Sequence, residues 1–238
     1  MHFRVLASSF VTIGVALLLV VACARATPAP TPLPTPTMTA QQARDLLSKA
    51  ALGFGDLSPG YELVAAGQYI SNEEAGKISK LGQGLMLAKI EEWGRIIGYA
   101  VSYRKGSEIL INTLDLYKDN SGALASLRWY PGNYTSLEHY LDDEIAHNLA
   151  GALGVAPSSM KVEVKQISFQ RFGDDSIAIS LSMSVGAIGR LEAIQVCEVK
   201  HSISGCVLLL SPGAEPGVLL QEIENVIRTM DRKLETIR

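Results

Sequence analysis

Hydrophobic residues near the C-terminus recur at helical spacing. Their positions, three or four residues apart, form one apolar stripe: Leu219, Leu220, Ile223, Val226, Ile227, Met230, Leu234 and Ile237. Pro216 stands just before the stripe, where the first turn of a helix tolerates it. The pattern predicts an amphipathic helix at the C-terminal end. Another helix is predicted over 40–52, because Thr39 and Gln42 form a capping-box pattern and Gly53 ends the apolar spacing.

Most of the remaining pattern is typical of β-strands. Segments 95–104 and 107–117 are predicted to form a hairpin, because Gly106 between them tolerates the positive φ of a tight turn. A short strand is expected over 61–66. Four more strands are expected in succession, rich in Val, Ile, Ser and Leu and separated by turn residues: 161–169, 176–185, 191–199 and 205–210.

Shorter helices are predicted between these strands. One begins at Ser71, another covers 121–130, and a third begins near Thr135 and ends at Gly154, whereas 85–90 fits either a helix or a strand. Because the strands do not alternate regularly with helices, the pattern predicts an α+β fold. We expect an antiparallel β-sheet with helices packed on one face, including the amphipathic C-terminal helix.

The first 22 residues have the architecture of a secretory signal. Arg4 gives a positive start, and an apolar run from Val5 to Ala22 ends in small residues. The alternative is an uncleaved anchor, since about 20 apolar residues suffice to span a bilayer. Both alternatives place the rest of the chain outside the cytoplasm.

The sequence Val20-Val21-Ala22-Cys23 resembles the lipobox of bacterial lipoproteins. The resemblance implies that residues 1–22 are a signal peptide and that Cys23 is the lipidation site, carrying acyl chains such as palmitate. It also implies a protein that is lipid-anchored at the extracytoplasmic face of the cell membrane.

A Thr/Pro-rich linker follows the lipidated cysteine over 23–38, with prolines at alternate positions: Pro28, Pro30, Pro32, Pro34 and Pro36. Each proline fixes its own φ and extends its predecessor, which favours a polyproline-II spacer of roughly 40 Å at about 3 Å per residue. Residues 39–238 are then expected to form a single extracytoplasmic domain.

Two phrases, Trp93-Gly-Arg-Ile-Ile-Gly-Tyr99 and Phe172-Gly-Asp-Asp-Ser176, resemble phrases of uncharacterised bacterial surface lipoproteins. The order of the expected elements also resembles that of exported α+β domains of the PsbP-like type. This resemblance implies a sheet covered by terminal helices and an accessory, binding or assembly role. It assigns no role to an individual residue.

The charge of the chain argues against a nucleic-acid partner. The net charge is −3, and two of the 21 basic residues, Arg4 and Arg25, precede Thr39, which leaves 19 basic against 24 acidic residues in the domain. A duplex-binding protein needs a basic face to displace the counterions of the phosphates, and no Lys/Arg-rich stretch is present.

Cys197 and Cys206 stand on consecutive predicted strands with a turn between them. Two remaining cysteines in an exported protein usually pair, and closing a loop of about ten residues stabilises a fold by roughly 2–3 kcal/mol. The alternative is a reactive or metal-binding pair that His201 joins. We expect the disulfide.

Three polar residues of the helix near Thr135 fall four residues apart: His139, Asp143 and His147. Two turns of helix could present them to zinc or copper. The alternative is the solvated polar side of an ordinary surface helix. We expect no metal and no other cofactor, with these three residues as the candidate ligands if a metal binds.

Asp174 and Asp175 follow Gly173 between two strands. Paired carboxylates could act as acid and base or bind calcium, whereas Gly and Asp are also typical of a β-turn, which is the interpretation we favour. An anion site would require the fold to gather three scattered arginines: Arg95, Arg171 and Arg190.

No catalytic motif accompanies these residues: the sequence holds no Gly-x-Ser-x-Gly, no His-Glu-x-x-His and no phosphate-binding glycine loop. The favoured hypothesis is a non-catalytic binding or accessory domain with a protein or small-molecule partner. The alternative is an extracytoplasmic enzyme, hydrolase-like, whose site is assembled from Asp174, Asp175, His139 and His147.

The lipobox yields a direct test. We expect the mature protein to begin at an acylated Cys23. Intact-mass analysis of the protein purified from membranes measures this, and an unmodified Cys23 still joined to residues 1–22 would refute it.

Overall fold

The computed structural model describes residues 38–78, 83–132, 160–185 and 189–237. The chain divides into two units, Met1–Thr37 and Met38–Arg238, and every described residue belongs to the second. The described helices are α1 (Ala40–Ala50), α2 (Asn72–Ile78), α3 (Gln83–Glu92), α4 (Asn120–Gly132) and α6 (Pro216–Glu235). The described strands are β1 (Glu62–Ile70), β2 (Arg95–Lys105), β3 (Glu108–Tyr117), β4 (Met160–Gln166), β5 (Asp175–Val185), β6 (Gly189–Lys200) and β7 (Ile203–Pro212).

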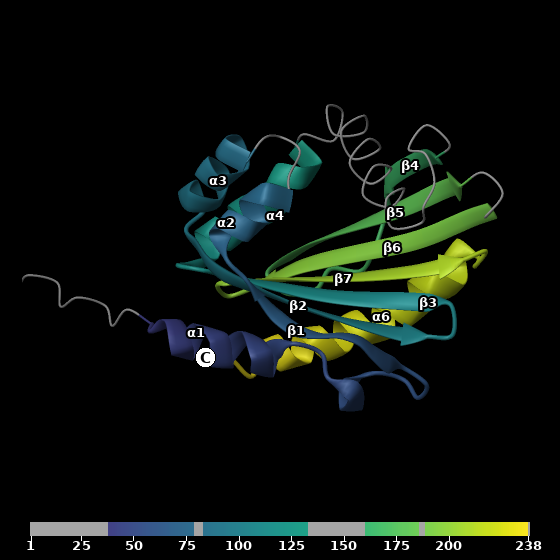
Figure 1. Cartoon of the computed structure of the whole chain (residues 1–238), viewed down its shortest axis with the longest axis horizontal. Helices are drawn as coiled ribbons and strands as arrows, with labels where there is room; N and C mark the ends of the chain where they lie inside the picture. Colours follow the sequence, from purple (N-terminus) through teal and green to yellow (C-terminus); the bar gives the residue numbers. More distant parts are fainter. Residues whose placement is uncertain (1–37, 79–82, 133–159, 186–188, 238) are drawn as a thin grey trace, which may run out of the picture. The chain divides into compact units, whose positions relative to one another are not determined.

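The seven strands form one antiparallel sheet in the order β1-β2-β3-β7-β6-β5-β4 (Figure 1). Strands β2 and β3 form the predicted hairpin, with Lys105 paired to Glu108 and Gly106 at a φ of 61°. Strands β3 and β7 join the two halves of the sheet, although they are far apart in the sequence. The α+β class, the antiparallel sheet and the C-terminal helix are therefore confirmed.

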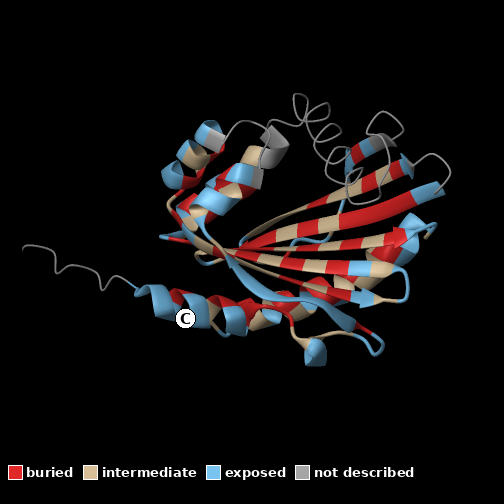
Figure 2. Ribbon diagram, viewed as in Figure 1, coloured by how far each residue is buried: buried red, intermediate tan, exposed pale blue. Residues whose placement is uncertain are grey.

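One face of the sheet packs against α1 and α6. Buried residues alternate along the central strands, and the matching stripe of α6 faces them (Figure 2). The core of this face includes the following side chains: Leu47, Leu110, Leu114, Val196, Val207, Leu209, Leu219, Ile223, Ile227 and Met230. The Thr39 hydroxyl accepts a hydrogen bond from the Gln42 amide at 3.2 Å, so the predicted capping box begins α1.

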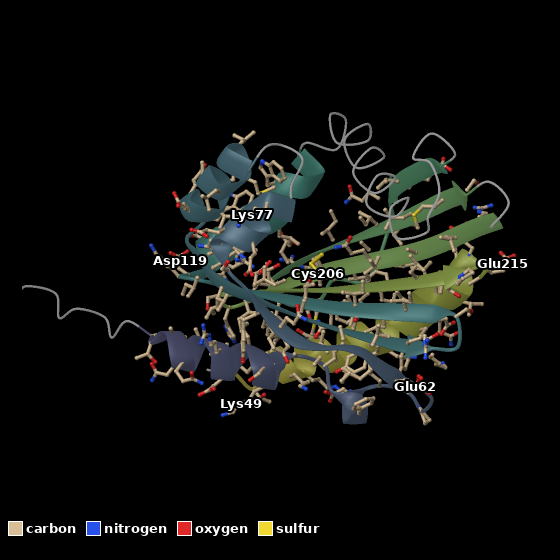
Figure 3. All side chains as sticks on the ribbon, viewed as in Figure 1. Lys49, Glu62, Lys77, Asp119, Cys206 and Glu215 are labelled. Carbon is tan, nitrogen blue, oxygen red and sulfur yellow. A yellow bond between two sulfur atoms is a disulfide. The ribbon has the colours of Figure 1, made fainter. Side chains whose placement is uncertain are left out.

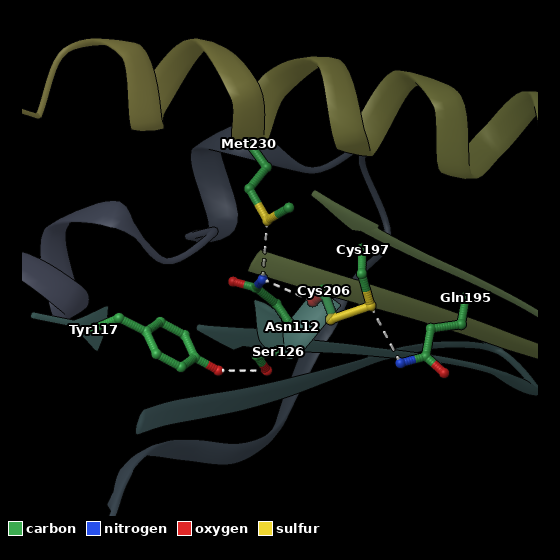
Figure 4. Close-up of a disulfide and its surroundings, with 7 residues drawn as sticks. All are labelled: Asn112, Tyr117, Ser126, Gln195, Cys197, Cys206 and Met230. Carbon is green, nitrogen blue, oxygen red and sulfur yellow. Dashed lines mark hydrogen bonds between the residues drawn. A yellow bond between two sulfur atoms is a disulfide. The ribbon is translucent and has the colours of Figure 1, made fainter. Parts of the chain in front are cut away.

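A buried amide on β3 connects the elements of this layer. The side chain of Asn112 is 0 % exposed. Its Oδ1 accepts a hydrogen bond from the Leu52 amide at 2.9 Å, and its Nδ2 contacts the Cys206 carbonyl oxygen at 3.2 Å and the Met230 Sδ at 3.3 Å (Figure 4). One side chain thus links the segment after α1, the neighbouring strand β7 and helix α6.

The other face of the sheet receives α4 at one end. There Trp93, Tyr117, Ala123, Leu127 and Val199 form a second apolar cluster. The Tyr117 hydroxyl donates to the Ser126 Oγ at 2.8 Å, which links β3 to α4 (Figure 4). In addition to the helices on the α6 face, α4 therefore packs on the opposite face.

The boundaries of several elements differ from the predicted ones. The ambiguous segment 85–90 is part of α3, and β1 extends to Ile70 because pairing with β2 carries it beyond the short apolar run. Strand β7 begins at Ile203, directly after a tight turn at His201. The helix predicted from Thr135 lies outside the described residues.

Within residues 38–78, 83–132, 160–185 and 189–237, no helix has both the length and the apolar character needed to cross a membrane.

A pair of glycines tests the packing of α4. A Cβ at Gly122 would lie 1.9 Å from the Trp93 carbonyl oxygen, whereas a Cβ at Gly217 in α6 meets no atom within 4 Å. We expect Gly122→Ala to lower the free energy of unfolding by about 1–3 kcal/mol through overpacking. Gly217→Ala, the control, should leave it unchanged or raise it by up to about 1 kcal/mol. Urea denaturation measures both, and equal effects would contradict the close approach.

Candidate functional site

The face of the sheet that carries the Cys197–Cys206 bond, which we call the disulfide face, is a candidate binding surface. Beyond the end that α4 covers, its floor is made of half-buried residues from three neighbouring strands: Ile111, Thr113, Gln195, Leu208 and Leu210. They pair directly, Ile111 with Leu208 and Leu208 with Gln195, so they share one face. The floor is mostly aliphatic and carries no charged side chain.

Cys197 and Cys206 form a disulfide across β6 and β7 at directly opposite positions. The pairing is the one that the sequence predicts. Figure 3 shows Cys206 near the middle of the sheet, and the Gln195 Nε2 lies 3.5 Å from the Cys197 Sγ (Figure 4). The bond fixes the register of the two strands that underlie the disulfide face.

Arg95 is buried near the α4 end of this face, with 7 % of its surface exposed. Its Nε and Nη2 lie 2.8 and 2.7 Å from Asp115 Oδ1, and its Nη1 donates to Asn72 Oδ1 at 2.8 Å. A Cβ at Gly98 would lie 2.1 Å from the Arg95 Nη2, so this close stacking requires glycine. The guanidinium therefore serves to hold the start of α2 on the sheet.

The other two arginines have different partners. Arg190 donates to the Ser182 hydroxyl and pairs with Glu192, and Arg171 donates to the carbonyl oxygen of Asp174. The structure does not gather the three arginines into an anion site.

Asp174 and Asp175 bind to different neighbours. The Asp174 Oδ2 accepts from the His201 backbone amide at 2.9 Å and from the Asn120 Nδ2 at 2.6 Å. His201 has a φ of 56°, which is uncommon for a residue other than glycine, so Asp174 holds a strained turn. Asp175 pairs with Arg128 at 3.1 Å. Each carboxylate therefore has its own structural partner: Asp174 lies in a bend, and Asp175 is the first residue of β5 rather than part of a turn.

The candidate metal ligands His139, Asp143 and His147 lie outside the described residues, as does Cys23. Within the part of the chain that the structure describes, no group of three or more His, Cys, Asp or Glu side chains is arranged to hold a metal ion.

Sequence reasoning missed Glu198, which is 0 % exposed on the α6 face of β6. Neither of its carboxylate oxygens has a hydrogen-bond partner. A signal was available: Ile194, Val196 and Glu198 alternate along one strand, which predicts that all three face the core. A buried acid without a hydrogen bond is costly, so it marks a special position.

No family model matches the sequence, and no curated protein matches it. Among solved structures, the extracellular domain of PknH from Mycobacterium tuberculosis is 6 % identical, with a TM-score of 0.52 over 80 % of this chain and 95 % of that chain. A putative uncharacterized protein from Mycobacterium smegmatis is 8 % identical, with a TM-score of 0.42 over 80 % of this chain and 96 % of that chain.

The likeness to the PknH domain shows a shared fold. At 6 % identity it assigns no function to a residue of this chain.

The two neighbouring aspartates provide a test of the turn interpretation. We expect Asp174→Ala to lower the free energy of unfolding by about 2 kcal/mol, because a charged acceptor of two hydrogen bonds is lost. Asp175→Ala removes a surface ion pair and should cost less than about 1 kcal/mol. Urea denaturation compares the two variants. Equal losses would show that Asp174 does not hold the His201 turn.

Proposed function

We propose that this chain is a membrane-tethered extracytoplasmic lipoprotein whose domain binds a partner protein and is not catalytic. The observation that carries the proposal is the Cys197–Cys206 disulfide. Structural disulfides persist in oxidising compartments outside the cytoplasm. The bond therefore agrees with the secretory signal over 1–22 and with Cys23 as the point of lipid attachment.

The shared fold adds support of a different kind. One solved structure of similar fold is described as the extracellular domain of PknH. Because that domain is extracellular, a similar fold is compatible with the extracytoplasmic location that we propose for this domain.

The disulfide face is the surface that we assign to the partner. Its half-buried residues lie on three adjacent strands, which at roughly 5 Å per strand spread them across the sheet rather than around an enclosed cavity. Small-molecule sites enclose most of the ligand surface, whereas protein partners bind to broad patches. This breadth and the lack of charge favour a protein over a small polar ligand.

The hydrolase-like alternative has weaker support. It required Asp174, Asp175 and two histidines to converge, and the two carboxylates are instead engaged by His201 and Arg128. His139 and His147 are not among the described residues.

Site-specific photo-cross-linking tests the assigned surface. Ile109 begins the row of Ile111 and Thr113 on the disulfide face and is 37 % exposed, whereas Val218 on α6 is 60 % exposed and serves as the control. With a photoreactive residue in the full chain in native membranes, we expect a defined protein adduct at position 109 but not at 218. Thr113→Lys should abolish that adduct, because it places a charge on the apolar floor.

Three other outcomes would overturn the proposal. Equal adducts at both positions would indicate non-specific contact. An adduct that survives Thr113→Lys would place the partner elsewhere, and an adduct of small mass would indicate a small-molecule ligand.

A further inference from the structure

Glu198 lies between β6 and α6, where its carboxylate faces a second acid. Lys200, two residues from Glu198 on the same face of β6, has its Nζ 3.4 Å from Asp231 Oδ1, which places Asp231 of α6 beside Glu198. The negative charge of Asp231 raises the pKa of Glu198. Both Glu198 oxygens lack a donor in the ionised form. A proton on Glu198 supplies the missing donor, because the carboxyl group can then donate to Asp231.

Only one cation faces this pair from the strand. Lys200, two residues along β6, has its Nζ 3.4 Å from Asp231 Oδ1 and 3.5 Å from Glu235 Oε1. Its single positive charge is therefore divided between two carboxylates of α6. Little of it remains to offset an ionised Glu198.

The charged groups of the loop before β5 have other partners: Arg171 donates to the Asp174 carbonyl oxygen, and the Asp174 Oδ2 accepts from the His201 amide. Ser176 pairs with Glu198 from β5, and its hydroxyl accepts from the Phe172 amide, while Gly205 pairs from β7. The loop before β5 covers the site, since a Cβ at Gly173 would lie 3.4 Å from the Glu198 Oε2.

One further charged group lies nearby on the helix. Arg228 of α6, one turn before Asp231, stacks on the Phe172 ring and pairs with Glu224 and Gln170. Its guanidinium is thus engaged by its own partners.

We propose that the Glu198–Asp231 contact is a proton-dependent latch that holds α6 on the sheet. With one proton shared by the two carboxyl groups, the contact is a hydrogen bond. Without that proton, the buried charge of Glu198 faces the like charge of Asp231, and the C-terminal part of α6 loosens.

The direction of the pH dependence follows from the pKa. Burial, followed by the charge of Asp231, raises the pKa of Glu198 from an ordinary 4.5 to about 8, with Lys200 acting in the opposite direction. The folded state thus keeps a proton that the unfolded state loses near pH 4.5. Stability should therefore fall as the pH rises from about 4.5 to about 8 and change little further through this group.

Thermal unfolding of the full-length chain in a non-ionic detergent measures the effect. Between pH 5.5 and pH 8.5 we expect the midpoint of the wild type to fall by roughly 10 °C. Glu198→Gln keeps the shape and a donor but cannot ionise, so at least half of that fall should disappear. The midpoint of this variant should exceed that of the wild type at pH 8.5.

A matched control uses the same strand and the same face. Glu192 is 5 % exposed, but it accepts from the Ser182 hydroxyl at 2.7 Å and pairs with Arg190. Glu192→Gln should lower the midpoint at every pH and keep the slope of the wild type. If Glu198→Gln keeps that slope as well, the latch is refuted.

Amide hydrogen exchange shows which part of α6 moves away from the sheet. After correction for the intrinsic rate, amides of 223–234 in α6 should lose protection above pH 8 while amides of the β2–β3 hairpin keep theirs. Simultaneous loss in both segments would overturn the proposal. If Glu198→Gln does not fold, Asp231→Asn decides: removal of the neighbouring charge should flatten the pH dependence, and an unchanged slope would refute the latch.

Discussion

The side chain of Asn112 is the polar contact on which the layered arrangement depends. It is completely buried on the central strand β3, and its amide group contacts the segment after α1, strand β7 and helix α6. A buried polar group without partners costs roughly 1–3 kcal/mol, so Asn112 is tolerated only when all three elements are in place. The apolar core would accept many relative positions of these elements, whereas the amide accepts few.

Apolar spacing was sufficient to predict most of the elements. The stripe from Leu219 to Leu234 and the hairpin turn at Gly106 are local signals, and the structure contains both the helix and the hairpin. The order of the strands could not be predicted in the same way. Strand β3 pairs with β7, and the sequence between them contains no mark of that pairing, because it depends on long-range packing around residues such as Asn112.

The candidate site could be predicted only in part, for the same reason. The cysteine pair follows from export and spacing, and it occupies opposite positions on two strands. The role of Asp174 depends on Asn120 and His201, which lie far from it in the sequence. Alternation along β6 could have revealed that Glu198 faces inward. The position of Asp231 opposite Glu198 could not be predicted, because it depends on how α6 packs on the sheet.

Strand β6 carries two opposite constraints at neighbouring positions. Cys197 joins it covalently to β7 on one face, while Glu198 faces α6 on the other with no hydrogen bond of its own. The disulfide and the strand ladder resist separation of β6 from β7, so repulsion between Glu198 and Asp231 is relieved on the side of the helix. Asp231 lies in the later turns of α6 (Pro216–Glu235), so we expect the movement to begin there. The same strand can therefore keep the disulfide face rigid while its other face responds to protonation.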